Sequence, residues 1–80
     1  MSVTFLTGEN CGACKQLKAQ LSQYGLDDKV TMLDAYSAEG ALFIAEHDLR
    51  SIPVLYNHST DKMIVGSKTT KEKLEEFFSL

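Results

Sequence analysis

Several features are scarce in this 80-residue sequence, and the scarcity of cysteine, of basic residues and of long apolar runs each excludes a class of protein. There is no tryptophan, and there are only one proline and two cysteines. Two cysteines are too few for the disulfide framework of a small secreted scaffold. Aspartate and glutamate outnumber lysine and arginine by 11 to 8, so no basic surface for nucleic acid is expected. No run approaches the ~18 apolar residues of a membrane span, so a membrane is not an expected partner either.

The length predicts a single domain over residues 1–80, because such a chain has no room for a second hydrophobic core. An apolar fraction of 44% is ordinary for a globular protein. The first residues lead directly into a strand-like run and lack the basic and then apolar regions of a secretory signal. We therefore expect a monomer in the cytoplasm, where thiols are kept reduced.

The spacing of apolar residues predicts elements in the order β-α-β-α-β-β-α. A strand-helix-strand start requires a parallel pair with a right-handed crossover, and a late hairpin adds an antiparallel strand. The predicted fold is therefore α/β, a mixed four-stranded sheet with three helices. Strands are expected at 3–6, 30–33, 53–56 and 63–65, and helices at about 11–24, at 38–47 and from about 70 onward.

Individual residues indicate where these elements begin and end. Gly25 is placed to end the first helix in a left-handed conformation, and Ser37 to cap the second helix. Thr69 and Glu72 have the spacing of a capping box at the start of the last helix. The strand at 30–33 is predominantly apolar, so we expect it to be buried on both faces.

Cys11 and Cys14 form a Cys-x-x-Cys pair between the first strand and the first helix. Such a pair serves redox chemistry or supplies half of a zinc site. A closed zinc site needs four ligands, and the two histidines, His47 and His58, are 11 residues apart, outside the usual spacing. As a structural disulfide the pair would close almost no loop. A position between strand and helix of a βαβ unit favours redox chemistry and no metal.

The two thiols are expected to differ. A cysteine at a helix N-terminus meets unpaired N–H groups and the positive end of the dipole, which lower its pKa from ~8.5 to about 3.5–7.5. Cys11 begins the helix, whereas Cys14 lies a turn further on the apolar face. We expect the Cys11 thiolate to attack a substrate disulfide and Cys14 to resolve the mixed disulfide. Gly12 and Ala13 are small and leave the approach to Cys11 open.

On these residues, the chain resembles the glutaredoxin branch of the thioredoxin superfamily over nearly its whole length. The segment Cys11-Gly12-Ala13-Cys14 matches the active-site dithiol. Ser51-Ile52-Pro53 resembles the Thr-Val-Pro segment, which implies a cis peptide bond before Pro53 and a backbone edge at Ile52 that pairs with the bound thiol. Val65-Gly66-Ser67 resembles the end of the last strand, where that family has a Gly-Gly turn.

The resemblance implies a substrate-binding surface around the dithiol. Arg50 falls where a family member often has a basic contact for a glutathione carboxylate, whereas Gly8 stands where glutaredoxins usually carry a lysine. The residues expected to bind substrate are Gly12, Ala13, Arg50, Ser51, Ile52, Pro53, Gly66 and Ser67.

The implied function is that of a dithiol-disulfide oxidoreductase, a small electron carrier that reduces protein disulfides. The chain is similar to redoxins that supply ribonucleotide reductase, which is one candidate acceptor. No tightly bound cofactor is expected, and glutathione or a flavoprotein reductase would restore the dithiol. Two alternatives stay open. One is a glutaredoxin-like dimer holding an iron–sulfur cluster through Cys11 and two glutathiones, and the other is a redox regulator similar to arsenate reductases.

Overall fold

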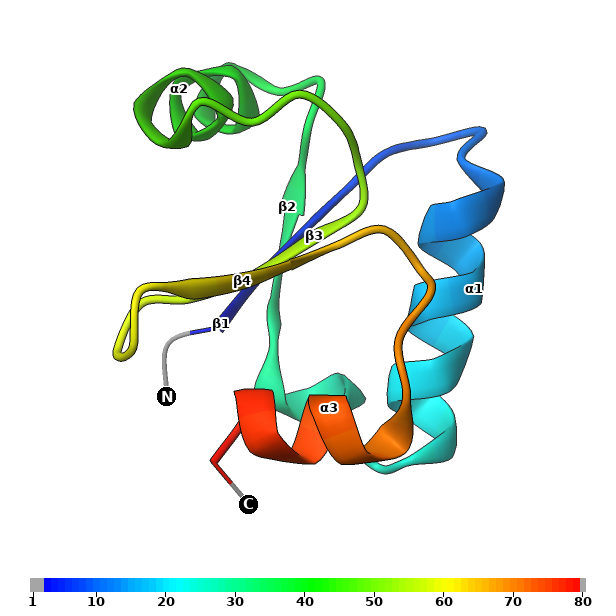
Figure 1. Ribbon diagram of the computed structural model, residues 1–80. Coiled ribbons are helices and arrows are strands. Elements are labelled where there is room, and N and C mark those ends of the chain that lie inside the picture. The colour runs from blue at the N-terminus through cyan, green and yellow to red at the C-terminus, as the bar shows by residue number, and fades with distance from the viewer. Residues whose placement is uncertain (1–2, 80) are drawn as a thin grey trace.

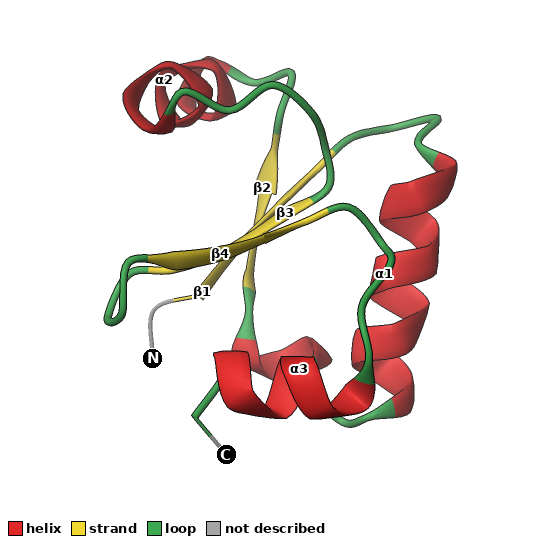
Figure 2. Ribbon diagram, in the orientation of Figure 1, coloured by secondary structure: helices red, strands yellow, loops and turns green. Residues whose placement is uncertain are grey.

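The computed structural model describes residues 3–79, which form a mixed four-stranded sheet with helices on both faces (Figure 1). The element order confirms the predicted β-α-β-α-β-β-α arrangement, with one 3₁₀ turn added (Figure 2). The elements are β1 (Val3–Thr7), α1 (Gly12–Gln23), the 3₁₀ turn (Asp27–Lys29), β2 (Thr31–Asp34), α2 (Ala38–His47), β3 (Val54–Asn57), β4 (Lys62–Val65) and α3 (Lys71–Phe77). Within this described part, no helix is long and apolar enough to cross a membrane.

The strands lie in the order β2-β1-β3-β4. β1 and β2 are parallel, with Phe5 opposite Met32, and β3 is antiparallel to both β1 and β4. The parallel pairing brings the carboxyl ends of β1 and β2 to one edge of the sheet. There the N–H of Ala35 donates to the carbonyl of Thr7 at 2.8 Å. The loops that follow these two strands are therefore neighbours.

Alternating residues of the strands build two separate apolar cores. On one face, α1 and α3 pack over the central strands, and α2 packs on the other face (Figure 1). The first core consists of Val3, Phe5, Leu17, Leu21, Leu26, Leu55, Leu74, Phe77 and Phe78. The second is smaller and is formed by Leu6, Ala35 and Val54 with half-buried residues around them. The central position of β1 between these cores fixes the place from which α1 begins.

Two expectations about local structure are wrong. β2 is not buried on both faces, because it lies at the edge of the sheet, where Met32 is 48% exposed. α3 is capped one residue later than expected, since the Oγ1 of Thr70 rather than Thr69 accepts an N–H, that of Lys73, at 3.2 Å. The capping of α2 is confirmed, with the N–H of Gly40 donating to the Oγ of Ser37 at 3.0 Å.

Gly40 lies where the first turn of α2 approaches the end of β2. A Cβ at this position would collide with the carbonyl oxygen of Asp34 and lie 2.9 Å from the Cα of Ala35. Both neighbours are backbone atoms, so they cannot turn away as a flexible side chain would. Gly40 is therefore required for the close approach of α2 to β2.

Replacement of Gly40 by alanine is expected to lower the free energy of unfolding by about 1–3 kcal/mol, because the added methyl group overpacks this contact. The loss is expected even though alanine is the better helix former by ~1 kcal/mol. Gly12→Ala is the matched control, since a Cβ there meets nothing within 4 Å. Urea unfolding of the oxidised proteins, followed by circular dichroism, measures both. Equal stability of G40A and G12A would contradict the close approach.

Candidate active site

Cys11 and Cys14 are joined by a disulfide at the junction of β1 and α1, with their Cα atoms 5.2 Å apart. Cys14 is only 2% exposed and packs beneath the first turn of α1, whereas Cys11 is half-buried. Gly12 and Ala13 occupy the first turn between them, and the side of this turn at Gly12 is open. The two sulfur atoms therefore differ in access from solvent, as their spacing on the helix predicts.

Cys11 is the N-cap residue of α1. Its Sγ accepts the N–H of Cys14 at 3.1 Å, and its carbonyl accepts the N–H of Lys15 at 3.2 Å. The preceding residue, Asn10, adopts a left-handed conformation with φ of 56°, which asparagine tolerates well. In the reduced protein a thiolate at Cys11 would face the unpaired N–H groups and the positive end of the helix.

The segments matched to the family lie together beside the sheet. The Ile52–Pro53 peptide bond is cis, as the resemblance implies. The carbonyl of Pro53 accepts the N–H of Gly66 at 2.8 Å. Ser67 donates its hydroxyl to the Oε1 of Gln16 at 2.9 Å, which ties the turn after β4 to α1. The structure thus connects the cis-proline loop to the Gly66-Ser67 turn, and that turn to the helix that carries Cys14.

The remaining predicted substrate-binding residues, Arg50, Ser51 and Ile52, line a pocket of about 280 Å³ between α2 and the loop before β3. Its other lining residues are Ala35, Tyr36, Ile44 and Leu49. The pocket is next to the loop of the dithiol, because a Cβ at Gly8 would lie 2.9 Å from the Cδ1 of Ile52.

Tyr36 is a residue of this pocket that the sequence analysis missed. A Cβ at Gly8 would lie 2.6 Å from the Cε2 of Tyr36, so the tyrosine ring covers the position where glutaredoxins usually carry a lysine. The ring is otherwise 73% exposed. One sequence signal could have indicated it, namely an aromatic residue two positions after a strand parallel to the one that precedes the cysteines.

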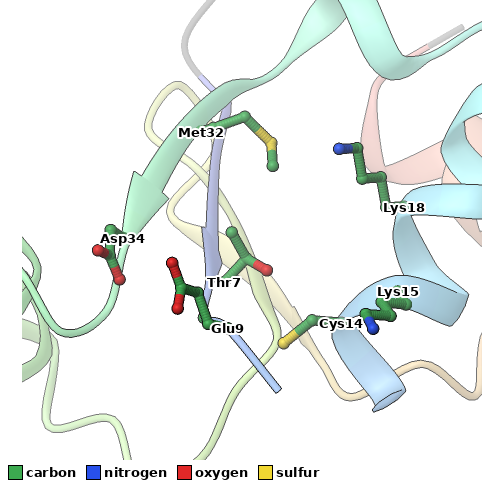
Figure 3. Close-up of a pocket in the computed structure, with 8 residues that line it drawn as sticks. Thr7, Glu9, Cys14, Lys15, Lys18, Met32 and Asp34 are labelled. Carbon is green, nitrogen blue, oxygen red and sulfur yellow. The ribbon is translucent and has the colours of Figure 1, made fainter. Parts of the chain in front are cut away.

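A larger cavity of about 430 Å³ borders the buried sulfur of Cys14 (Figure 3). Lys15 and Lys18 of α1 form one wall, while Glu9 and Asp34 lie on the opposite side. Met32, Thr7 and Gly8 complete the lining. Cys14 therefore exposes little of its surface, and it borders an open pocket that carries charges of both signs.

The two histidines belong to an aromatic cluster rather than to the cysteine pair. The rings of His47 and His58 lie 4.3 and 4.8 Å from that of Tyr56, centroid to centroid. Tyr56 pairs with Thr4 near the start of β1, whereas Cys11 follows the end of that strand. Within residues 3–79 no three His, Cys, Asp or Glu side chains gather as a metal site.

Residues 2–79 match the family described as Glutaredoxin-like domain (DUF836). This chain belongs to that family. Among solved structures, it is similar to a thioredoxin from Thermus thermophilus, with a TM-score of 0.73, 17% identity, and coverage of 98% of this chain and 71% of that one. It is also similar to thioredoxin 1 from Thermosipho africanus, with a TM-score of 0.61, 11% identity, and coverage of 99% and 96%. A search of curated proteins finds no significant match.

At these identities the two thioredoxins show a shared fold, and this confirms the predicted thioredoxin-like architecture. The roles of individual residues of the glutaredoxin-like domain rest on its own geometry.

In the reduced glutaredoxin-like protein, Cys11 is expected to react with iodoacetamide at least about tenfold faster than Cys14 at neutral pH, because it is accessible and caps the helix. Fragment-ion mass spectrometry locates the modified cysteine at each time. In 8 M urea the two rates should converge, since unfolding removes both the helix and the burial. Faster modification of Cys14 in the folded protein would reverse the assignment of the attacking thiol.

Proposed function

We propose that this glutaredoxin-like protein is a thiol-disulfide oxidoreductase that passes two electrons from the Cys11–Cys14 dithiol to a disulfide of a protein substrate. The observation that carries the proposal is the position of the pair, with Cys11 capping α1 and Cys14 buried behind it. The thioredoxin-like fold also supports it. A structural role explains the pair poorly, because cysteines three positions apart constrain the unfolded chain very little.

The exchange has two steps that balance in atoms and electrons. The Cys11 thiolate attacks one sulfur of the substrate disulfide and forms a mixed disulfide, and the other substrate sulfur leaves as a thiolate that takes up a proton. Cys14 then loses its proton and attacks the Sγ of Cys11. This forms the Cys11–Cys14 disulfide and releases the second substrate thiol. The Cα separation of 5.2 Å lets Cys14 reach Cys11 without movement of the backbone.

The reductant that restores the dithiol is either glutathione or a flavoprotein reductase, and we favour the reductase. Tyr36 covers Gly8, where glutaredoxins usually carry a lysine, so that cationic contact for glutathione is missing. Arg50 is the remaining candidate for a glutathione carboxylate, and its side chain is 82% exposed. Ribonucleotide reductase is a reasonable protein acceptor within the same proposal.

The reduction of insulin disulfides tests the function. NADPH is supplied in both arms, with thioredoxin reductase in one and with glutathione plus glutathione reductase in the other. We expect turnover with thioredoxin reductase to exceed that with glutathione. Cys11→Ser should lower turnover by roughly 100-fold or more, because it removes the attacking sulfur. Cys14→Ser should instead accumulate a mixed disulfide between Cys11 and the substrate, visible as a mass increase that dithiothreitol reverses.

Two results would contradict the proposal. One is the absence of insulin reduction with both reductant systems, and the other is undiminished turnover by C11S. Lys62→Gln, on the hairpin at the far end of β3, is the control for nonspecific effects of substitution.

A further inference from the structure

The pocket beside Tyr36 has a volume of about 280 Å³, near the lower end of the roughly 300–1,000 Å³ of small-molecule sites, which is room enough for an aliphatic side chain. Ile44, Leu49 and Ile52 give it an apolar lining. Tyr36 lies at the edge of the pocket and is 73% exposed. Tyrosines are enriched where proteins contact one another.

The place of this pocket in the fold connects it to the dithiol. Tyr36 and Gly8 follow the carboxyl ends of the parallel strands β2 and β1, the end at which α/β proteins bind their ligands. Gly8 precedes Cys11 by three residues, and a Cβ at Gly8 would meet both the Tyr36 ring and the Ile52 side chain, at 2.6 and 2.9 Å. When the cysteine of a polypeptide reaches Cys11, the residues next to that cysteine can therefore reach this pocket.

Arg50 gives the pocket a charge. Its guanidinium lies 3.3 Å from the carboxylate of Asp48, and both side chains are more than four-fifths exposed. Such an exposed pair is weak, so an incoming carboxylate can compete for the guanidinium. The protein carries a net charge of −3, so its overall field does not attract an acidic ligand. Any attraction to such a ligand comes from its local contact with Arg50.

We propose that this pocket docks the polypeptide beside the substrate cysteine. An aliphatic side chain enters against Tyr36 and Ile52, and an adjacent aspartate or glutamate pairs with Arg50. Tyr36 and Arg50 are then specificity-determining residues that select acidic, apolar sequences around a target disulfide. The proposal rests on the proposed function, because docking matters only if the cysteine of the same polypeptide reacts with Cys11.

Short peptides with one cysteine, activated as the 2-pyridyl disulfide, test this selection. The reduced protein forms a mixed disulfide with the peptide and releases pyridine-2-thione, which is followed by absorbance. The acidic, apolar peptide carries leucine two residues and aspartate three residues from the cysteine. It is made in two versions, with this pair before or after the cysteine. In the reference peptides, serine replaces the leucine and asparagine replaces the aspartate. We expect the acidic, apolar peptide to react about five- to tenfold faster in at least one version. The part of the ratio due to aspartate should shrink at 0.5 M salt.

Substitutions then assign the selection to the pocket. Tyr36→Ala should remove the part of the rate ratio due to leucine, and Arg50→Gln the part due to aspartate. Tyr36→Phe and Arg50→Lys should retain the ratio, because ring and charge are kept. The matched controls are Leu42→Ala and Lys62→Gln. Leu42 is a 65% exposed side chain of α2 outside the pocket lining, and Lys62 is an exposed lysine on the hairpin. Both controls should keep the wild-type ratio.

The outcomes separate this proposal from the proposed function. Wild-type protein that fails to reduce the small neutral compound 2,2′-dipyridyl disulfide would refute both. Rapid reduction of that compound with equal rates for the two peptides would refute docking alone, as would a rate ratio that Y36A and R50Q leave intact. If those two variants slowed only the reduction of glutathione disulfide, the pocket would bind glutathione, and the docking proposal would be overturned.

Discussion

The N-terminus of α1 is the constraint on which the candidate active site depends. A helix start leaves several backbone N–H groups without partners. Here the sulfur of Cys11 serves one of them, the N–H of Cys14, at 3.1 Å. Because β1 is an interior strand of the sheet and leads into this turn, the packing of the sheet fixes where that sulfur lies. The contact that caps the helix thus also holds Cys11 where backbone dipoles favour a thiolate over a thiol.

The parallel pairing of β1 with β2 is the second constraint, because it brings two loops together that are distant in sequence. The loop after β1 carries Gly8 and Cys11, and the loop after β2 carries Tyr36. The tyrosine ring lies over Gly8 in a position that a larger residue would need. One aromatic side chain therefore shapes the surface beside the dithiol, where it covers Gly8 and borders a small apolar pocket. In the proposed function, the dithiol carries out the exchange, and this edge of the sheet selects the partner.

Sequence reasoning succeeded where the signal is local. The start of α2 at Ala38 follows from the Ser37 cap, and the order of elements follows from the spacing of apolar residues. It failed where the outcome depends on the assembled sheet. The apolar run of β2 does not reveal that this strand lies at the edge, since burial depends on strand order. Thr69 and Thr70 both have a capping side chain, and only the packed turn determines which one is used. The contact of Tyr36 with Gly8 joins residues that no local pattern relates.

The reduction potential of the Cys11–Cys14 pair tests the central claim most directly, because it separates an exchanging dithiol from an inert crosslink. The protein would be equilibrated at pH 7 in buffers with defined ratios of reduced to oxidised thiol. Alkylation would then stop the exchange, and mass spectrometry would give the fraction of protein with a reduced pair. We predict a single two-electron transition at a potential between about −270 and −120 mV, the range of exchanging dithiols in related proteins. A potential below about −300 mV, or a reduced pair that does not close again, would contradict the account.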